Sequence, residues 1–249
     1  MEAPGSPQTP RFFVDLHCHT RASFDSLASP SSVVRAAAQR GLTHLLITDH
    51  DRIDGALEAR DKAPDELTVI VGEEIRTSAG DLIGAFLEHP IEPGLPPSEA
   101  VAAIREQGGL VGMPHPFDRF RGSLMRDVGM ASLAPLVDWV EIHNARLLGG
   151  GNELAAEFAD AEGLPGVAVS DAHTTLEIGV AYTVLDREVS SPEALRDALQ
   201  RADIVTGRAS YVLRALTPAV KIVNRLRGNR RVRPLPAAGH VTPDRVMFR

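Results

Sequence analysis

The amino-acid sequence predicts an α/β fold and, within that class, a barrel of parallel strands covered by helices. Short stretches rich in Val, Ile and Leu alternate with helical stretches along most of the 249 residues. Strands that helices bury on both faces have such continuous apolar runs. Polar residues also follow almost every apolar stretch. A barrel gathers all of its strand ends around one mouth, whereas an open sheet shares a site only near its switch point, so the barrel is favoured.

The chain before residue 114 is expected to form strands and helices in turn. The strands are predicted at 12–17, 42–48, 67–71, 80–87 and 110–113, and the helices at 33–40, 53–62 and 99–107. Ser29 and the serines after Pro30 offer N-cap hydroxyls to the first helix, which Gly41 ends. The runs at 67–71 and 80–87 are predicted to pair as a hairpin.

The alternation continues after a polar loop at 117–130. Strands are predicted at 137–142, 166–169, 180–185 and 204–206, and helices at 152–162 and 194–200. The strand at 180–185 is expected at an edge of the sheet. A last helix is predicted over 211–227, with a break at Pro218.

Composition divides the chain into three parts. Residues 1–10, rich in Pro, Gly and Ser, are expected to be a disordered leader, 11–207 the barrel domain, and 208–249 a basic C-terminal helix and tail. No apolar run approaches the roughly 18 residues of a membrane span, so no membrane association is expected. The single cysteine, Cys18, excludes an intrachain disulfide and fits a cytoplasmic location. Nothing in the sequence predicts the oligomeric state.

The net charge of −7 hides an uneven distribution. Residues 1–207 contain 16 Lys and Arg against 32 Asp and Glu, whereas residues 208–249 contain 10 against one. The basic tail either docks on its own acidic body or contacts nucleic acid or phosphate. The tail shows no aromatic stacking platform, so docking on the body is the favoured interpretation.

Residues suited to metal binding lie at the ends of the predicted strands. His17 and His19 end the first strand, and the period of two places both imidazoles on one face and Cys18 on the other. The full candidate set is His17, His19, Asp25, His50, Glu74, His115, Asp171 and His173. Mixed imidazole and carboxylate ligands suit Zn, Mn or Fe, and this number of ligands fits two or three divalent ions that share a bridging carboxylate.

These motifs resemble those of the PHP family (polymerase and histidinol phosphatase) in order from about residue 12 to residue 186. They are His17-x-His19, Asp25, Thr48-Asp49-His50-Asp51, Gly72-Glu73-Glu74-Ile75, Pro114-His115-Pro116 and Ser170-Asp171-Ala172-His173. The resemblance implies a distorted, TIM-like (β/α)7 barrel of PHP type, with a metal site at the C-terminal mouth of the strands. It also implies that the protein hydrolyses phosphoesters.

The resemblance further implies how the ligands are shared. One ion would be held by His17, His19, Glu74 and Asp171, and a second by Asp25, His50 and His173. Glu74, preferred to Glu73, would bridge toward a third position that uses His115. Many members of the family have another histidine for that third ion, where this chain has Asp81, so a third ion requires Asp81 or His143 as a substitute.

The expected chemistry is attack by metal-activated hydroxide. Two cations that share a water molecule lower its pKa toward about 7, and they also neutralise the phosphate oxygens. His143 is the candidate proton donor to the leaving group, with a structural, hydrogen-bonded histidine as the alternative. Arg146 is the first-ranked guanidinium for the phosphate. Asp15 and Asp49 are candidates to orient the ligands or a backbone turn.

The expected substrate is a phosphomonoester or phosphodiester of a small metabolite or nucleotide, with short oligonucleotides second. Long nucleic acid is possible but not favoured, because the acidic body repels it. One alternative is a metal-dependent amidohydrolase, another barrel that begins with His-x-His. Its binuclear sites usually need a carboxylated lysine at a strand end, and neither Lys62 nor Lys221 ends a predicted barrel strand. The other alternative is a metal-binding module without catalysis, against which the nearly complete ligand set argues.

Overall fold

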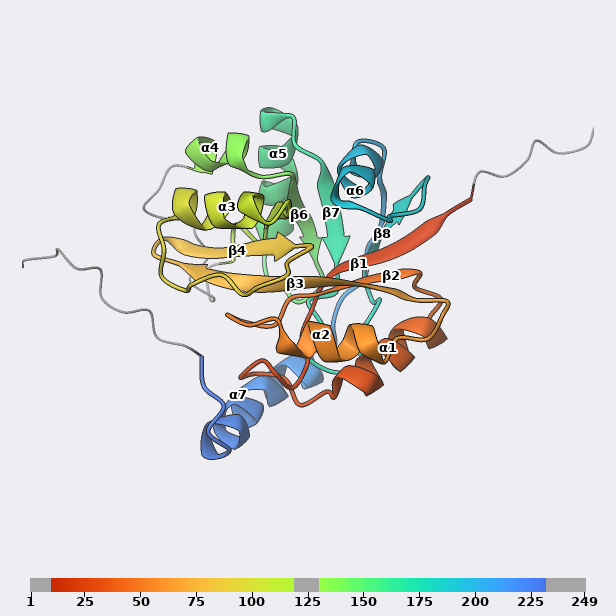
Figure 1. The fold of residues 1–249 in the computed structure, drawn as a ribbon, viewed down its shortest axis with the longest axis vertical. Coiled ribbons are helices and arrows are strands. Elements are labelled where there is room, and N and C mark those ends of the chain that lie inside the picture. Colours follow the sequence, from red (N-terminus) through yellow and green to blue (C-terminus); the bar gives the residue numbers. More distant parts are fainter. Residues whose placement is uncertain (1–9, 119–129, 232–249) are drawn as a thin grey trace, which may run out of the picture.

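The computed structural model describes residues 10–118 and 130–231, and Figure 1 shows the arrangement of their elements. The strands form one sheet in the order β7-β6-β5-β4-β3-β2-β1-β8-β9. Their bounds are β1 Phe12–Cys18, β2 His44–Ile47, β3 Thr68–Thr77, β4 Gly80–Ala85, β5 Leu110–Met113, β6 Trp139–Asn144, β7 Gly166–Val169, β8 Tyr182–Leu185 and β9 Asp203–Val205. Residues 1–9 of the predicted leader and residues 232–249 of the predicted tail lie outside the described residues.

The sheet curls into a nearly closed barrel, which confirms the predicted fold class. A parallel bridge joins Cys18 at the end of β1 to Ala172 after β7, and the His19 N–H donates to the Ala172 carbonyl over 2.8 Å. The strict count of seven β/α units is not what the structure shows. Strands β3 and β4 form the predicted antiparallel hairpin, and β8 and β9 extend the sheet beyond β1 in antiparallel pairing.

Helices cover the outside of the sheet. Their bounds are α1 Pro30–Gln39, α2 Asp54–Asp61, α3 Pro97–Glu106, α4 Met130–Leu133, α5 Gly151–Glu162, α6 Pro192–Leu199 and α7 Tyr211–Leu226, with a short 3-10 helix at Ala134–Leu136. Ser29 caps α1 as predicted, because its side chain accepts from the Ser32 N–H. None of the helices in the described ranges is both long and apolar enough to cross a bilayer.

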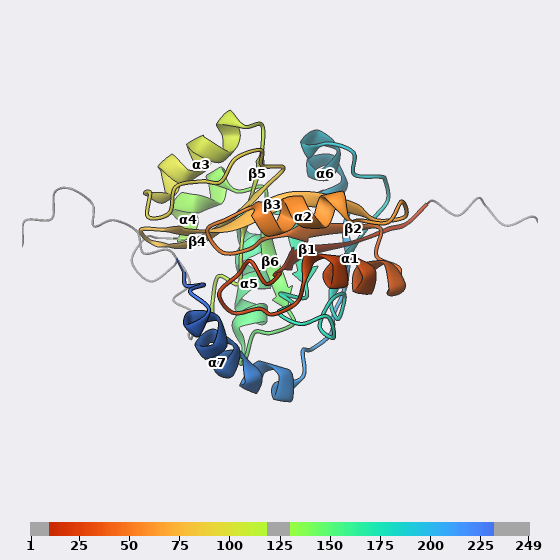
Figure 2. The same cartoon turned by 60° about the horizontal axis from the view of Figure 1, so that its bottom comes forward.

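The predicted break at Pro218 is wrong, because α7 continues through this residue. A proline removes one main-chain hydrogen bond, but the ladder on either side of it can persist. Contacts on both sides of Pro218 hold the helix on the body: the Thr217 hydroxyl accepts from Arg146, and Asn224 donates to main-chain carbonyls after β1. Figures 1 and 2 both show α7 below the sheet, away from α3, α4 and α6.

Candidate metal centre

The eight predicted ligands converge at the mouth of the barrel. The segment at the end of β1 supplies His17 and His19, and β3 supplies Glu74. The others follow strand ends or lie in the loop after β1, as the sequence predicts. All eight side chains are buried, the most exposed being His50 at 9%. As strand alternation predicts, the Cys18 side chain packs into the hydrophobic core and not into this centre.

The ligand atoms fall into three overlapping groups, within each of which they lie within 4.8 Å of one another. The groups are His19, Asp25, His50 and His173; His17, His115 and Asp171; and His17, His19 and Glu74. The shared members, His17 and His19, have their Nε2 atoms 3.0 Å apart. The groups are thus adjacent compartments of one centre, which is the arrangement that several ions with common ligands require.

Glu74 lies between the histidines of the metal centre. Its Oε2 is 3.4 Å from His17 Nε2, and 3.0 Å from His50 Nδ1, while its Oε1 is 3.3 Å from His115 Nε2. The adjacent Glu73 points elsewhere and accepts from the Ile91 N–H over 2.9 Å. The structure therefore places Glu74 in contact with histidines of all three groups, and it leaves Glu73 out of the centre.

Polar atoms in the centre fit a cation. Asp25 Oδ1 and Glu74 Oε2 are buried and make no hydrogen bond with any described residue. A buried carboxylate without a donor is costly unless it is paired or coordinates a metal ion. Facing imidazole nitrogens and unbonded carboxylate oxygens together form a donor set that suits Zn, Mn or Fe.

The pKa directions of His19 and Glu74 agree with this use. The pKa of His19 lies well below its usual value, because burial disfavours the charged ring and His173 and His50 add like charge. A neutral imidazole keeps the lone pair that a metal needs. Burial opposes ionisation of Glu74, but the close imidazole rings, His50 first among them, outweigh it and hold its pKa well below the usual value. Glu74 is therefore a carboxylate at neutral pH.

Backbone strain is concentrated in this region. Of the four described non-glycine residues with positive φ, three are Asp51, His115 and Asp171, at 55°, 24° and 51°. This conformation costs energy for residues with a Cβ, and it tends to persist at functional sites where the surroundings enforce it. At His115 and Asp171 the turn occurs at the residue whose side chain enters the centre.

Glu141 contacts two of the candidate ligands and was not among the residues predicted from the sequence. Its Oε1 is 2.6 Å from His17 Nδ1, and its Oε2 accepts from the His115 N–H and the Asn144 side chain. A carboxylate on the second ring nitrogen fixes the tautomer and orientation of a ligating histidine. The signal in the sequence is an acidic residue inside the apolar run Trp139-Val140-Glu141-Ile142.

Replacing Glu141 with Gln is expected to weaken metal affinity about 10-fold to 100-fold, because the amide no longer holds His17 by a charged hydrogen bond. Metal titration followed by calorimetry measures the effect. Glu153→Gln, on the exposed face of α5, is the matched control and is expected to bind as the native chain does. Equal affinity for Glu141→Gln would contradict this role.

The two other carboxylates predicted to support the centre bind the backbone. Asp15 accepts from the N–H groups of Ser170 and Gly179. Asp49 accepts from the N–H and hydroxyl groups of Thr20 and Ser23. Both residues therefore hold the turns that carry the ligands, which is the second of the two roles considered for them.

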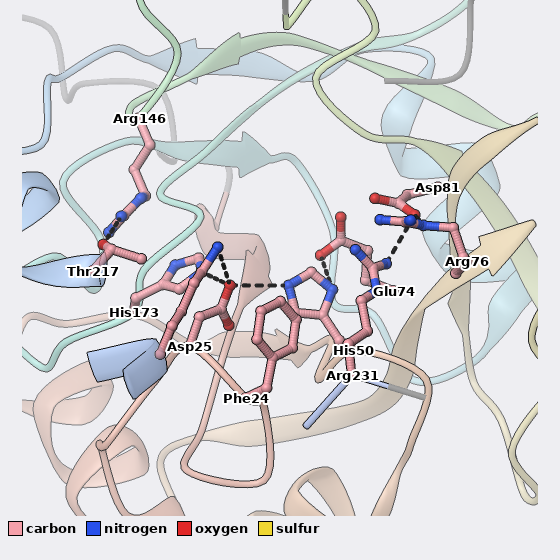
Figure 3. Close-up of a pocket in the computed structure, with 11 residues that line it drawn as sticks. Phe24, Asp25, His50, Glu74, Arg76, Asp81, Arg146, His173, Thr217 and Arg231 are labelled. Carbon is pink, nitrogen blue, oxygen red and sulfur yellow. Dashed lines mark hydrogen bonds and ion pairs between the residues drawn. The ribbon is translucent and has the colours of Figure 1, made fainter. Parts of the chain in front are cut away.

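A pocket of about 330 Å³ opens onto the centre (Figure 3). Phe24, Asp25, His50, Glu74 and His173 line one part of it. Four basic side chains and two further residues line the rest, namely Arg76, Arg146, Lys221, Arg231, Asp81 and Thr217. Ligands for a cation and donors for an anion thus face the same space.

The residues predicted to act beside the metal site are placed differently from one another. Arg146 lines the pocket, but its Nη1 lies 2.6 Å from Glu177 and its Nη2 donates to Thr217 on α7. His143 is not among the pocket residues, and its Nε2 lies 2.7 Å from the Gly207 carbonyl. Asp81 binds Arg76 and Arg231 over 2.6 and 2.8 Å, so two guanidiniums engage the residue considered for a third ion.

Comparisons with known proteins agree with this geometry. Residues 15–124 match the family model of the PHP domain, and residues 149–204 match the model described as PHP-associated. An uncharacterized protein of Methanocaldococcus jannaschii, MJ1587, is 35% identical over 143 residues, which cover 53% of this chain and 81% of that protein.

Two solved structures share the fold. A two-domain protein of Bacteroides vulgatus, containing a predicted PHP-like metal-dependent phosphoesterase, has a TM-score of 0.69 at 18% identity, covering 83% of this chain and 68% of that one. Endonuclease Q, in complex with a 27-mer duplex with an abasic lesion at the active site, has a TM-score of 0.58 at 17% identity. The match covers 77% of this chain and 57% of that one.

Proposed function

Because this chain belongs to the PHP family and has the fold of PHP-like metal-dependent phosphoesterases, we propose that it is a hydrolase acting on phosphoester bonds. The observation that carries the proposal is the convergence of eight buried candidate ligands on one centre, because four of them (Asp25, His50, Glu74 and His173) line a pocket that basic side chains also line. Two or three divalent ions, Zn, Mn or Fe, are the proposed cofactors. Bound there, they would activate water and neutralise the charge on the phosphate.

The chain's own residues have separate tasks in this proposal. Glu74 holds the compartments of the centre together, and Glu141 fixes the ring of His17. The basic side chains of the pocket bind the anionic part of the substrate. His143 stays a prediction as the proton donor, because its ring binds the Gly207 carbonyl. Arg146 stays a prediction as a phosphate ligand, since Glu177 already compensates its charge.

The proposed substrate is a phosphomonoester or phosphodiester of a small metabolite or nucleotide. The size of the pocket, about 330 Å³, lies at the lower end of the range for small-molecule sites. The structural likeness to endonuclease Q in complex with DNA supports nucleic acid as the second candidate. The net charge of the body favours the small substrate.

The amidohydrolase alternative has less support in the structure. Lys62 follows the end of α2 and Lys221 lies in α7, so neither lysine ends a strand of the barrel.

The cytoplasmic location of the protein stays a prediction from the sequence.

The test is hydrolysis of p-nitrophenyl phosphate and bis(p-nitrophenyl) phosphate by the purified protein with Mn²⁺ or Zn²⁺. We expect activity with one of the metals and its loss on chelation. His17→Ala is expected to be inactive, because it removes a member of two ligand groups. His89→Ala, at an exposed position, is the control and should keep the native activity. Activity of the His17→Ala protein would contradict the assignment of this centre as the active site.

A further inference from the structure

The C-terminal segment, residues 211–231, is built into the rim of the pocket although it lies outside both family-model matches. The Asn224 side chain is buried at 3% exposure and donates to the carbonyls of Phe24 and Ser26 over 3.1 and 2.9 Å. The Asn229 side chain donates to the carbonyls of Arg21 and Ala22. Both asparagines thus bind the loop after β1, which carries the predicted ligand Asp25.

This docking places two basic side chains of the segment in the pocket. Arg231, 18% exposed, approaches Asp51 with Nε at 3.2 Å and Asp81 with Nη2 at 2.8 Å. Lys221 Nζ lies 3.7 Å from Asp25 Oδ2. Both cations lie over the Phe24 ring, at 5.0 Å for Lys221 and 5.8 Å for Arg231. Figure 3 shows Arg231 beside Glu74 and His50.

Donors on these side chains remain available to a ligand. Arg231 uses Nε and Nη2 for its two aspartates, and its Nη1 makes no hydrogen bond with any described residue. Arg76 reaches Asp81 through Nε alone, so neither of its terminal nitrogens has a partner in the described part of the chain. Asp25 is the one carboxylate within 4.0 Å of Lys221 among the described residues, and Asp25 itself belongs to the metal centre.

We propose that Lys221 and Arg231 of the C-terminal segment, with Arg76 of β3, bind the terminal phosphate of the substrate, so that the segment is part of the active site. The inference rests on the proposed function and names its substrate class as a phosphomonoester. Arg146 is not one of these three side chains, but it donates to Thr217 and so helps to hold α7 against the body.

The charge and the shape of the pocket favour a terminal phosphate. A phosphomonoester carries between one and two negative charges at pH 7 and offers three oxygens to donors. Arg76, Lys221 and Arg231 line the same pocket as residues of the metal centre, and the volume of this pocket is about 330 Å³. Thr217 and Lys221, which also line it, belong to α7. An internal phosphodiester carries only one negative charge. Its second ester substituent would also have to fit beside the C-terminal segment.

The test compares Lys221→Met and Arg231→Gln with the native chain on p-nitrophenyl phosphate. We expect KM to rise roughly tenfold or more in each variant, as expected for loss of a charged hydrogen bond, while kcat changes far less. Competitive inhibition by inorganic phosphate should weaken in parallel. The rise in KM for bis(p-nitrophenyl) phosphate should be smaller. Metal content, measured by mass spectrometry, should be unchanged, because neither residue belongs to a ligand group.

Lys62→Met and Arg230→Gln are the matched controls, since both side chains are exposed. Native KM and phosphate inhibition in both Lys221→Met and Arg231→Gln would overturn the proposal, even if the native chain hydrolyses the esters as proposed. Calorimetry with inorganic phosphate is a readout that needs no turnover. Phosphate binding that both variants lose upholds the subsite even if no ester is hydrolysed, and a metal-loaded native protein that binds no phosphate at millimolar concentration refutes it. Lys221 is 48% exposed, so its variant does not depend on refolding a core.

Discussion

Replacing Glu74 with Gln is expected to lower kcat/KM for a phosphoester about 1,000-fold or more. Its two oxygens contact histidines of different ligand groups, His17 and His50 through Oε2 and His115 through Oε1. The amide removes the negative charge and offers one acceptor in place of two. Loss of a single fixed electrostatic group at a reacting centre typically costs about 100-fold to 1,000-fold, and Glu74 also holds the centre together.

The neighbouring residue supplies a matched control for this change. Burial raises the pKa of Glu73 to about 8, so its side chain is neutral at pH 7, and it accepts from the Ile91 N–H. Glu73→Gln keeps a neutral acceptor of the same shape and is expected to retain native activity. Steady-state kinetics with saturating metal measure both variants. Equal losses at the two positions would show that the effect is structural and not specific to Glu74.

The second large effect is stabilisation by metal. Buried ligands brought together from separate strands are assembled only in the folded chain, so ions that bind there stabilise the native state. At a free metal concentration 100-fold above Kd, the free energy of unfolding should rise by about 2.7 kcal/mol. For a domain of this size that corresponds to a rise in Tm of roughly 5–11 °C.

Thermal unfolding with and without a chelator measures this stabilisation. Glu74→Gln should lose most of the response, whereas Glu73→Gln should keep it. A native protein whose Tm is the same in chelator and in excess Zn²⁺ or Mn²⁺ would contradict the existence of the site. The Tm of each variant in chelator, without metal, measures any separate effect of the substitution on the stability of the fold.

The sequence predicted which residues converge at the mouth of the barrel because their positions follow from local rules. Strand alternation places His17 and His19 on one face and Cys18 on the other, and parallel strands bring their ends together. Glu141 was missed because it lies within a strand, where an acidic residue is recognisable only once its partner His17 is known. Its role depends on two residues 124 positions apart, which no local pattern connects.

The roles of the residues around the centre were also hard to predict, because they depend on contacts between distant parts of the chain. Arg146 was the first candidate for the phosphate, but Glu177 lies beside it in the fold. Asp81 was considered as a metal ligand, but Arg76 and Arg231 surround it. The predicted break at Pro218 failed because contacts of α7 with the body outweigh the local preference of proline. Docking of the basic tail on the body was favoured, and the described residues up to Arg231 do dock there.

The closure of the barrel ties formation of the metal centre to completion of the chain during synthesis. The Ser26 hydroxyl donates to the His173 carbonyl across 147 residues, next to the bridge between Cys18 and Ala172. Closing so long a loop is slow, because its entropy is lost before the contacts compensate for it. A ribosome-bound chain that has emerged only as far as β6 lacks Asp171 and His173. Such a nascent chain should therefore hold metal weakly, and tight metal uptake during translation would mark the moment at which the last strands arrive.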